Sequence, residues 1–416
     1  MAGWSAGMAR GLGWREGCRL EVQARSSSEV RGAAAVKLAF IHKAYGVFGG
    51  TERVLESLTR QLAERGHEID VYAGWVDPRF GRSRFARFKK LWVVGPFPVL
   101  RSLALFLSST LRVRRGRYDV VVHFGRTGPL DVYRCGGGCH RVWFELLLAS
   151  AGGWFSRLWL RMSLQHRFVL WHERRALSSG GLIVAPSEQA RRDLVAVYGE
   201  AAERVRVLPN GVDLNRFHPK LRTLFFEEQR QQLHILPEET LVVFVASDFW
   251  RKGLDRLLVA MEYVAQEVRD LRLLVVGEDR RRDSYDRMAE SHGLRGKVGF
   301  AGEVDSPERI YAVADLLVLP TRYDPFANVT IEALACGLPV VTTRCNGAAE
   351  GLAEGDALAL VDSTDSPEQL VAAMGRMLEG TSQARRREAA RELAESLSEE
   401  SAVDRWERLL ARIEEG

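Results

Sequence analysis

Cysteine is scarce in this chain of 416 residues, and its spacing does not suit a disulfide framework. The five cysteines are scattered and odd in number, so a small disulfide-bonded fold is excluded and a reducing, cytoplasmic compartment is expected. Two of them lie close together, in the run CGGGCH from Cys135 to His140. Three residues between two thiols fit neither a haem attachment motif nor a usual zinc knuckle, and no second pair of ligands follows. We therefore expect no metal site.

Long apolar runs are also lacking. No stretch approaches the roughly 18 to 20 uninterrupted apolar residues that span a bilayer, and the best candidate, from Pro96 to Leu111, is interrupted by Arg101 and by serines. Residues 1–35 lack the apolar stretch of a signal peptide, and we expect a disordered extension or a misplaced start there. The first predicted strand is not followed by G-x-G-x-x-G, which gives a dinucleotide-dependent dehydrogenase no support.

The length is too great for one ordinary core and indicates two domains, because domains run to about 100 to 200 residues. Hydrophobic residues make up 46% and charged residues 27%, as in soluble globular proteins, so neither wholesale disorder nor a fibrous repeat is expected. We expect an N-terminal domain over residues 36–219, a C-terminal domain over 220–395 and a C-terminal helix over 396–416.

Short apolar strands alternate with helical patterns in both halves. A strand KLAFIH begins at Lys37, a glycine-rich turn follows, Thr51 to Arg65 has a helical apolar stripe, and EIDVYA returns as a strand after Gly66. Such βαβ units predict parallel sheets, here two Rossmann-like doubly wound α/β domains facing each other across a cleft, with ligands at the carboxyl ends of the strands. Further strands are expected at 119–124, 131–135, 181–187, 204–210, 240–246, 271–277, 297–302, 315–320 and 338–343.

The most informative stretch is PTRYDPFANVTIEALACGLPVVTT, from Pro320 to Thr343. Seven residues separate Asp324 from Glu332, and Glu332 lies on a helix that begins inside the segment. The start of a helix offers unpaired N–H groups to a diphosphate, and the two carboxylates accept hydrogen bonds from sugar hydroxyls and a ribose. Two plainer interpretations stay open, Asp324 as a helix N-cap and Glu332 as a surface helix residue. The N–H groups expected to be unpaired belong to Phe326, Ala327, Asn328 and Val329.

Several motifs together resemble a known family. NGVDLNRF, the RKG of SDFWRKGLDRLL, the run VGFAGEV…IYAVADLLVLPT and EALACGLPVV match in order and spacing the retaining GT-B glycosyltransferases of the GT4 class, which carry an E-x7-E motif here. The agreement covers most of the chain from Val36 onward. FGGTERV, LDVYRCGGGCH and SDFWRKGLD are similar to the branch that adds the first glucose to the inner-core heptose of lipopolysaccharide.

The resemblance implies roles on the donor side. Arg251 and Lys252 match a cationic pair expected to neutralise the donor diphosphate and stabilise the leaving nucleotide, so that no metal is required; a surface pair at a helix start is the plainer alternative. Asp324 takes the place of the first glutamate of the motif, one methylene shorter, and acts near the donor sugar. Glu332 matches the second glutamate, which is expected to bind the ribose.

In the first domain, Gly49 and Gly50 follow Phe48 in the turn after the first strand, where the family has sugar or phosphate contacts. We expect these two glycines to bind the donor; an ordinary tight turn is the alternative. On the acceptor side we consider His123, Asp131 and His140 as groups that handle the acceptor proton or steady the reacting sugar. The branch usually has another aspartate where this chain reads GGG, and that departure leaves the acceptor-side acid unidentified.

Basic residues gather in the front half. Arg79 to Lys90 holds six cations and no carboxylate, and RVRRGR follows from Arg112; solvated faces, phosphate-bearing partners and anionic lipid are all open. From His140 to Arg175, tryptophans mix with arginines, which suits either core packing or attachment to an anionic membrane.

We expect a retaining hexosyltransferase at the inner face of the cytoplasmic membrane, moving glucose from UDP-glucose to a lipid-linked oligosaccharide such as the inner-core heptose. A non-catalytic protein that binds sugar nucleotides or lipid is the alternative. Sugar-nucleotide epimerisation is less favoured by the motifs, and nucleic acid is not an expected partner because no RNA- or DNA-binding module is recognised.

Overall fold

The computed structural model describes residues 35–46, 49–81, 83–113, 115–125, 131–178, 180–199, 204–362, 366–379 and 382–414. The chain divides into two compact units. The N-terminal unit contains the described residues up to Gly211 together with the last helix, and the C-terminal unit is Val212–Ser398. The extension expected at the N-terminus, up to residue 34, and Phe48 lie outside the described residues.

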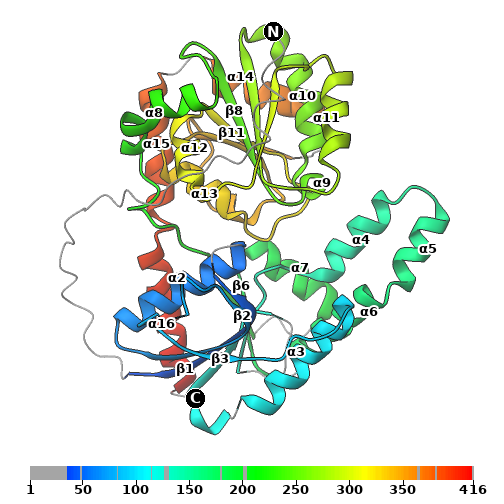
Figure 1. Ribbon diagram of the computed structural model, residues 1–416, viewed down its shortest axis with the longest axis vertical. Coiled ribbons are helices and arrows are strands. Elements are labelled where there is room, and N and C mark those ends of the chain that lie inside the picture. The colour runs from blue at the N-terminus through cyan, green and yellow to red at the C-terminus, as the bar shows by residue number, and fades with distance from the viewer. Residues whose placement is uncertain are drawn as a thin grey trace. The chain divides into compact units, whose positions relative to one another are not determined.

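The N-terminal unit is built on a sheet of seven parallel strands in the order β3-β2-β1-β4-β5-β6-β7 (Figure 1). Its strands are β1 (Lys37–Tyr45), β2 (Glu68–Val76), β3 (Arg87–Lys90), β4 (Val120–His123), β5 (Val132–Arg134), β6 (Leu182–Ala185) and β7 (Val205–Val207). Its helices are α2 (Gly50–Glu64), α3 (Pro98–Arg112), α4 (His140–Ser150), α5 (Trp154–Met162), α6 (Leu164–Ser178), α7 (Glu188–Tyr198) and α16 (Glu399–Glu414).

The C-terminal unit has a sheet of six parallel strands in the order β10-β9-β8-β11-β12-β13. Its strands are β8 (Thr240–Val245), β9 (Leu271–Val276), β10 (Val298–Gly302), β11 (Leu316–Leu319), β12 (Val340–Thr343) and β13 (Leu358–Val361). Its helices are α8 (Lys220–Gln232), α9 (Phe249–Lys252), α10 (Leu254–Glu267), α11 (Arg282–Ser291), α12 (Pro307–Val313), α13 (Asn328–Ala335), α14 (Pro367–Leu378) and α15 (Gln383–Glu395).

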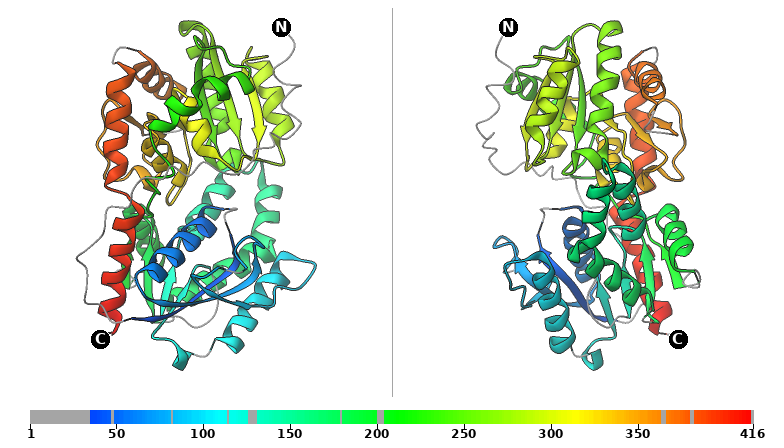
Figure 2. Two further views of the ribbon diagram at one scale, coloured as in Figure 1. Left: turned by 60° about the vertical axis from the view of Figure 1, so that its left-hand side comes forward. Right: turned by 90° about the vertical axis from the view of Figure 1, so that its right-hand side faces the viewer.

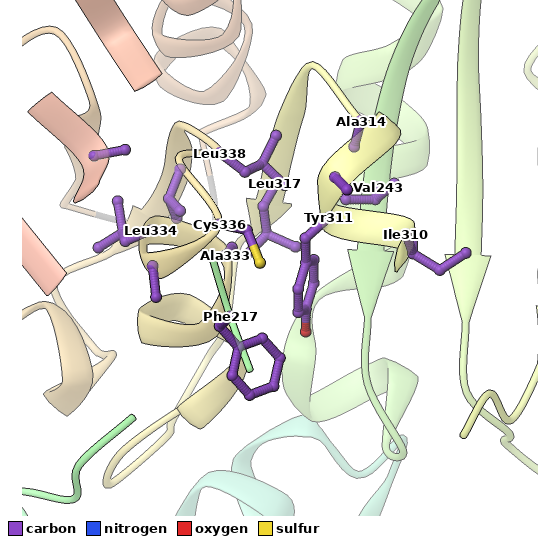
Figure 3. Packing of buried hydrophobic residues seen from close by; sticks show 14 of the residues in the cluster. Phe217, Val243, Ile310, Tyr311, Ala314, Leu317, Ala333, Leu334, Cys336 and Leu338 are labelled. Atoms are coloured by element: carbon purple, nitrogen blue, oxygen red, sulfur yellow. The ribbon is translucent and has the colours of Figure 1, made fainter. Parts of the chain in front are cut away.

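Strand residues of the C-terminal sheet alternate between two buried clusters. Val243 belongs to the cluster drawn in Figure 3, whereas its neighbours Val242 and Phe244 belong to the second. Both faces of the sheet are therefore covered, and helices flank it on either side (Figure 2). Full burial of an apolar side chain contributes about 1.5 to 3 kcal/mol, which makes these clusters the main source of stability. The prediction of two doubly wound parallel-sheet domains is confirmed.

The boundary between the units lies nearer the N-terminus than residue 219. Val212 and Phe217 are buried in the first cluster of the C-terminal unit, and the Val212 N–H donates to the Leu397 carbonyl at 2.8 Å. The last helix, α16, returns to the N-terminal unit and packs on α2. Arg65, the C-cap of α2, pairs there with Asp404 at 2.6 Å. NGVDLNRF thus contributes to both units, and the C-terminal helix completes the first one.

Two strands escaped the sequence analysis, and one of them explains part of the basic stretch after Arg79. Residues 87–90 form the edge strand β3, where Arg87 donates to Asp70 at 2.8 Å and Lys89 to the same carboxylate at 2.6 Å. Arg79 pairs with Asp77 at 2.7 Å. These cations are neutralised by carboxylates of the sheet, which weakens the case for this stretch as a lipid or phosphate surface.

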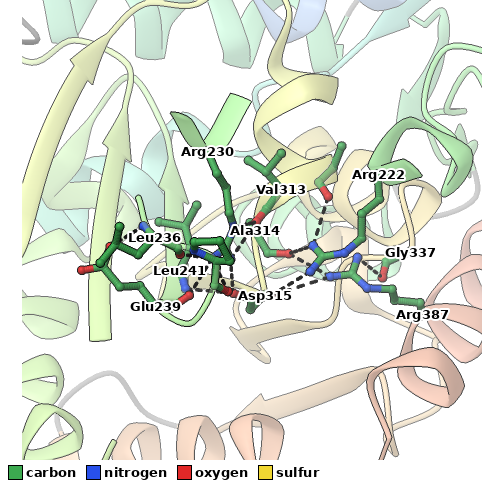
Figure 4. A network of polar contacts seen from close by, with 12 residues as sticks. Arg222, Arg230, Leu236, Glu239, Leu241, Val313, Ala314, Asp315, Gly337 and Arg387 are labelled. Carbon is green, nitrogen blue, oxygen red and sulfur yellow. Dashed lines mark hydrogen bonds and ion pairs between the residues drawn. The ribbon is translucent and has the colours of Figure 1, made fainter. Parts of the chain in front are cut away.

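A polar network closes the end of α12 in the C-terminal unit (Figure 4). Asp315 accepts from Arg230 at 2.6 Å and pairs with Arg222 at 3.4 Å, and the carbonyls of Val313 and Ala314 accept from arginines as well. The last carbonyls of a helix need such donors. The network fixes the chain just before β11, the strand that leads into the carboxylate-bearing loop.

Candidate functional site

The chain reverses its direction of travel across the C-terminal sheet between β8 and β11, which are neighbours. The chain adds β9 and β10 on one side of β8, and then returns to build β11, β12 and β13 on the other. Loops that leave the carboxyl ends of two such strands diverge and leave room for a ligand. The first of these loops leads into α9 with Arg251 and Lys252, and the second, residues 320–327, carries Asp324.

Helix α9 is fixed against the second loop by its backbone. Asp248 caps the helix by accepting from the Arg251 N–H at 3.2 Å. The carbonyl of Arg251 accepts from the N–H of Arg322 at 2.8 Å and from the hydroxyl of Thr321 at 3.2 Å. The RKG motif and the carboxylate loop, far apart in sequence, are thus one structural element. The guanidinium of Arg251 pairs with Asp248 at 3.3 Å and is 26% exposed.

Lys252 and Asp324 form a buried ion pair. Their residues are 8% and 4% exposed. Burial lowers the pKa of the Lys252 ammonium well below its usual value, and the positive charge of Arg251 lowers it further. The negative charge of Asp248 acts in the opposite direction and raises the pKa of Lys252, but it does not outweigh burial. Two residues that the sequence placed in one site are in direct contact, and Lys252 does not lie on the surface.

Asp324 organises the start of α13. Its Oδ1 accepts from the Phe326 N–H at 3.0 Å, and its backbone bridges to Asn346. The side chain of Asn346 accepts from the Ala327 N–H at 3.2 Å. Two of the four N–H groups expected to be unpaired, those of Phe326 and Ala327, are therefore satisfied within the unit, and that expectation is wrong for them. By position, Asn328 and Val329 at the helix start remain the donor-side candidates.

Glu332 lies on the inward face of α13 and is only 6% exposed, so the interpretation as a surface helix residue is wrong. Its Oε2 accepts from the hydroxyl of Tyr311 at 3.1 Å. Tyr311 itself packs in the cluster of Figure 3, beside Phe217 with ring centres 6.2 Å apart. Tyr311 was missed from the sequence. A buried carboxylate with a fixed donor is held in one orientation, as a ligand-binding group needs to be.

In the N-terminal unit the chain order reverses between β1 and β4. Gly49 is the N-cap of α2 and Gly50 its first residue, at the carboxyl end of β1. An added Cβ on Gly49 would lie 2.4 Å from Oε2 of Glu52, whose other oxygen contacts His42 at 3.2 Å and Lys43 at 3.5 Å. Glycine at position 49 therefore leaves room for the Glu52 carboxylate.

Glu52 was also missed by the sequence analysis. Burial alone raises its pKa, but the hydrogen bond and charge of His42 and the charge of Lys43 outweigh burial and lower the pKa of Glu52 from 4.5 to about 2. An acidic residue in the first turn of a helix is favoured by the helix dipole, and this was the signal available in the sequence.

The three acceptor-side candidates, His123, Asp131 and His140, do not all lie at the same edge of the sheet. Asp131 precedes β5 and its Oδ2 accepts from the N–H of Val121 at 3.0 Å, at the amino end of β4, opposite the edge where ligands bind. Asp131 therefore holds two strands together and is withdrawn as a catalytic candidate. His140 begins α4 beyond the carboxyl end of β5, with its Nε2 3.2 Å from Nδ1 of His166. His123 ends β4 and is buried.

An exposed apolar surface covers helix α5 of the N-terminal unit. None of its residues is buried, and Trp154, Phe155 and Trp159 are exposed by 75%, 68% and 70%. In the described structure α5 is therefore not part of the core. Helix α3, in the segment that the sequence analysis weighed only as a membrane span, exposes Leu107 and Leu111 in the same way. None of the helices in the described parts of the chain is long and apolar enough to cross a bilayer.

Comparison with known proteins agrees with this architecture. Residues 48–216 match the model of glycosyltransferase family 4, and residues 225–394 match that of the group 1 glycosyl transferases. The chain is 28% identical over 342 residues to the lipopolysaccharide glucosyltransferase WaaG of Escherichia coli K12, covering 80% of this chain and 87% of that protein. It is 30% identical to D-inositol 3-phosphate glycosyltransferase 2 of Catenulispora acidiphila, covering 79% and 82%.

Solved structures show the same fold. The crystal structure of WaaG, described as a glycosyltransferase involved in lipopolysaccharide biosynthesis, superposes with a TM-score of 0.76 at 25% identity and covers 90% of this chain and 99% of that one. The Anabaena protein HepE, in complex with UDP and glucose, superposes with a TM-score of 0.70 at 19% identity, covering 90% and 99%. With its two matched domain models and two parallel-sheet units, this chain belongs to the GT-B glycosyltransferases of group 1 and family 4.

Proposed function

We propose that this glycosyltransferase transfers glucose, with retention at the anomeric carbon, from UDP-glucose to a lipid-linked oligosaccharide such as the inner-core heptose of lipopolysaccharide. The observation that carries the proposal is the contact between Lys252 and Asp324, which joins the RKG motif to the carboxylate motif at the switch point of the C-terminal sheet. The similarity to WaaG, a lipopolysaccharide glucosyltransferase, supports the choice of sugar and acceptor.

On this proposal the C-terminal unit binds the donor. Arg251 and Lys252 are each paired with one carboxylate, Asp248 and Asp324, so both cations are held in place before the donor arrives. A guanidinium has five N–H groups and an ammonium three, which leaves donors for phosphate oxygens as negative charge develops on the leaving diphosphate. Glu332, oriented by Tyr311, accepts from the ribose hydroxyls. The transfer on this account uses these side chains and requires no metal.

In addition to acting near the donor sugar, Asp324 has a structural role. Its short side chain reaches the Phe326 N–H and Lys252 at once, so it shapes the loop that precedes α13 as well as the charge of the site. A family glutamate at this place would carry its carboxylate one methylene further. The shorter reach places the sugar contact of this enzyme closer to the loop.

Attachment to an anionic membrane surface brings the enzyme to a lipid-linked acceptor. Helix α5 exposes Trp154 and Trp159 together with Arg157 and Arg161, a combination that inserts rings at the headgroup level and places guanidinium groups on phosphates. The exposed leucines of α3 add apolar area in the same unit. The expected place of the enzyme is the inner face of the cytoplasmic membrane.

The direct test is a transfer assay with UDP-glucose and a heptose-terminated core acceptor, in which nuclear magnetic resonance reads the anomeric configuration of the new bond. An α-linked product from the α-configured donor supports retaining transfer. An inverted product, or transfer from a GDP sugar but not from UDP-glucose, would contradict the specific assignment. Binding of UDP without turnover of any donor would favour a non-catalytic sugar-nucleotide-binding protein, the alternative suggested by the altered first carboxylate.

A further inference from the structure

Arg322 lies in the loop 320–327, just before Asp324, and only 8% of its side chain is exposed. Its guanidinium group forms a bidentate ion pair with Asp255: Nη1 donates to Oδ1 at 2.9 Å and Nη2 donates to Oδ2 at 2.6 Å. Asp255 is in the first turn of α10, where the helix dipole favours a carboxylate. Arg322 therefore joins the loop that carries Asp324 to the helix that follows the RKG motif.

The same residue binds both peptide groups that flank Arg251. Nη1 of Arg322 also donates to the carbonyl of Trp250, and the Arg322 N–H donates to the carbonyl of Arg251 at 2.8 Å. The guanidinium carbon lies 4.7 Å from the centre of the Trp250 ring, which adds a cation–π contact. The backbone on either side of Arg251 is thus held by one residue of the carboxylate loop.

Helix α9 needs such an external contact because it is only four residues long. A single helical turn fixes several dihedral angles for very few hydrogen bonds, so it is unstable on its own. The last carbonyls of a helix also lack their regular partners within it, and Arg322 supplies donors to two of them. Arg251 and Lys252 are the last two residues of α9, so a shift of this turn would move both cations.

Direct contact of Arg322 with the donor is the competing interpretation, since arginine is a common phosphate ligand. The contacts of its side chain argue against this. Both Nη atoms are directed at the carboxylate of Asp255, which neutralises the guanidinium charge, and the side chain is largely covered. Arg251, by comparison, is 26% exposed and has a single contact between its guanidinium and Asp248. The structure therefore gives Arg251 the contact with the donor and Arg322 the role of holding it.

We propose that Arg322 is a positioning residue for donor binding, which holds Arg251 and Lys252 where the donor diphosphate binds and does not itself touch the donor. The inference rests on the proposed glycosyl transfer and adds a residue to its machinery. Its consequence is specific to the diphosphate. Loss of Arg322 displaces the two cations, whereas Glu332, proposed to bind the ribose, is oriented by Tyr311 and keeps its place.

The test compares the affinities of wild type and Arg322→Met for UDP, by calorimetry, and for uridine, by ligand-observed nuclear magnetic resonance. UDP binding is expected to weaken by roughly tenfold to a hundredfold, the scale of a displacement of about 1 Å, and uridine binding should be unchanged. Arg272→Met is the matched control, because Arg272 pairs with Glu239 at 2.6 Å near the amino end of β9, opposite the ligand-binding edge. The control should lose stability and keep the wild-type ratio of UDP to uridine affinity. The same ratio in Arg322→Met as in wild type would overturn the inference.

Two milder variants serve where Arg322→Met fails to fold. Arg322→Lys keeps the charge and the backbone N–H but cannot form the bidentate pair, and Asp255→Asn removes the charge that orients the guanidinium. Both are expected to lose UDP affinity selectively and to a smaller degree than Arg322→Met. Unchanged UDP affinity in both variants would overturn the inference.

Donor hydrolysis by the wild-type protein separates this inference from the proposed function. Hydrolysis by wild type together with unchanged UDP affinity in the Arg322 variants would refute only the role of Arg322. Absence of nucleotide binding and of donor hydrolysis in wild type would refute the proposed function and this inference with it.

Discussion

Gly253 lies against the backbone of Pro320 so closely that no side chain fits between them. A Cβ on Gly253 would lie 2.0 Å from the Pro320 carbonyl oxygen, and Gly253 has φ +84°, a conformation that L-residues rarely adopt. Gly253 joins α9 to α10. The contact therefore sets how closely the RKG motif approaches the loop that carries Asp324.

Replacing Gly253 by alanine is expected to push α9 away from that loop. The variant should lose more stability than the roughly 1 to 2 kcal/mol that positive φ alone costs, and UDP affinity should fall with it. Urea unfolding and calorimetry with UDP measure the two effects. The matched control is Gly293→Ala, at φ +70° with open space around it, which should show the backbone cost alone. Equal losses in both variants would mean that the contact with Pro320 is unimportant.

The ion pair of Lys252 and Asp324 yields a prediction that separates fold from function. Lys252→Met and Asp324→Asn each leave one buried charge unpaired, which costs about 3 to 5 kcal/mol. The double variant removes both charges and should regain most of that stability. Catalysis should not return, because the double variant lacks the Lys252 ammonium that stabilises the leaving diphosphate. Denaturant unfolding and donor hydrolysis on the three variants measure this, and recovery of activity in the double variant would contradict the site.

Acid stability should depend on Glu52. Its folded-state pKa of about 2 is lower than its ordinary 4.5, so its contribution is fully present above pH 4.5 and is lost as pH falls towards 2. A shift of this size corresponds to roughly 3 kcal/mol at most. Urea unfolding of wild type and Glu52→Gln between pH 7 and pH 3 measures the contribution. The gap between the two proteins should narrow on acidification, and a gap that stays constant would show that the carboxylate charge is not responsible.

The exposed rings of α5 predict membrane binding. Replacement of Trp154, Trp159 and Arg161 by alanine should abolish flotation with vesicles that contain anionic lipid and leave donor hydrolysis unchanged. Leu236→Ala in the C-terminal unit, where the side chain is 56% exposed, is the control for loss of a single exposed apolar residue. Unchanged flotation of the triple variant would show that α5 does not bind the membrane.

Much of the architecture could be predicted from the sequence, because strands covered on both faces read as continuous apolar runs. The donor-side candidates were chosen partly for a similar reason, since Arg251, Lys252 and Asp324 follow strands β8 and β11. Glu332 was chosen for its spacing from Asp324 and for its match to the family motif. The edge strand β3 was missed because its cations resemble a solvated face until Asp70 is placed beside Arg87.

Contacts between residues that are distant in sequence could not be predicted from the sequence. Nothing in the pattern shows that Asn346 occupies the Ala327 N–H, or that Tyr311 donates to Glu332. Asp131 was misjudged because a residue that begins a strand lies at the amino end of the sheet, and the direction of β5 decides this. Such contacts are set by register and packing, which one sequence does not display.

The central claim is that the C-terminal unit holds a working donor site, and slow donor hydrolysis tests it most directly because no acceptor is needed. The purified protein is incubated with UDP, GDP, ADP and dTDP sugars, and the variants Glu332→Ala and Glu262→Ala are assayed beside it. Glu262→Ala is the control, because the carboxylate of Glu262 lies outside the motif and pairs with His292 at a distance of 2.6 Å. We predict release of UDP from UDP-glucose, reduced by orders of magnitude in Glu332→Ala and retained in Glu262→Ala. No nucleotide release from any donor, or equal release by Glu332→Ala and wild type, would contradict the account.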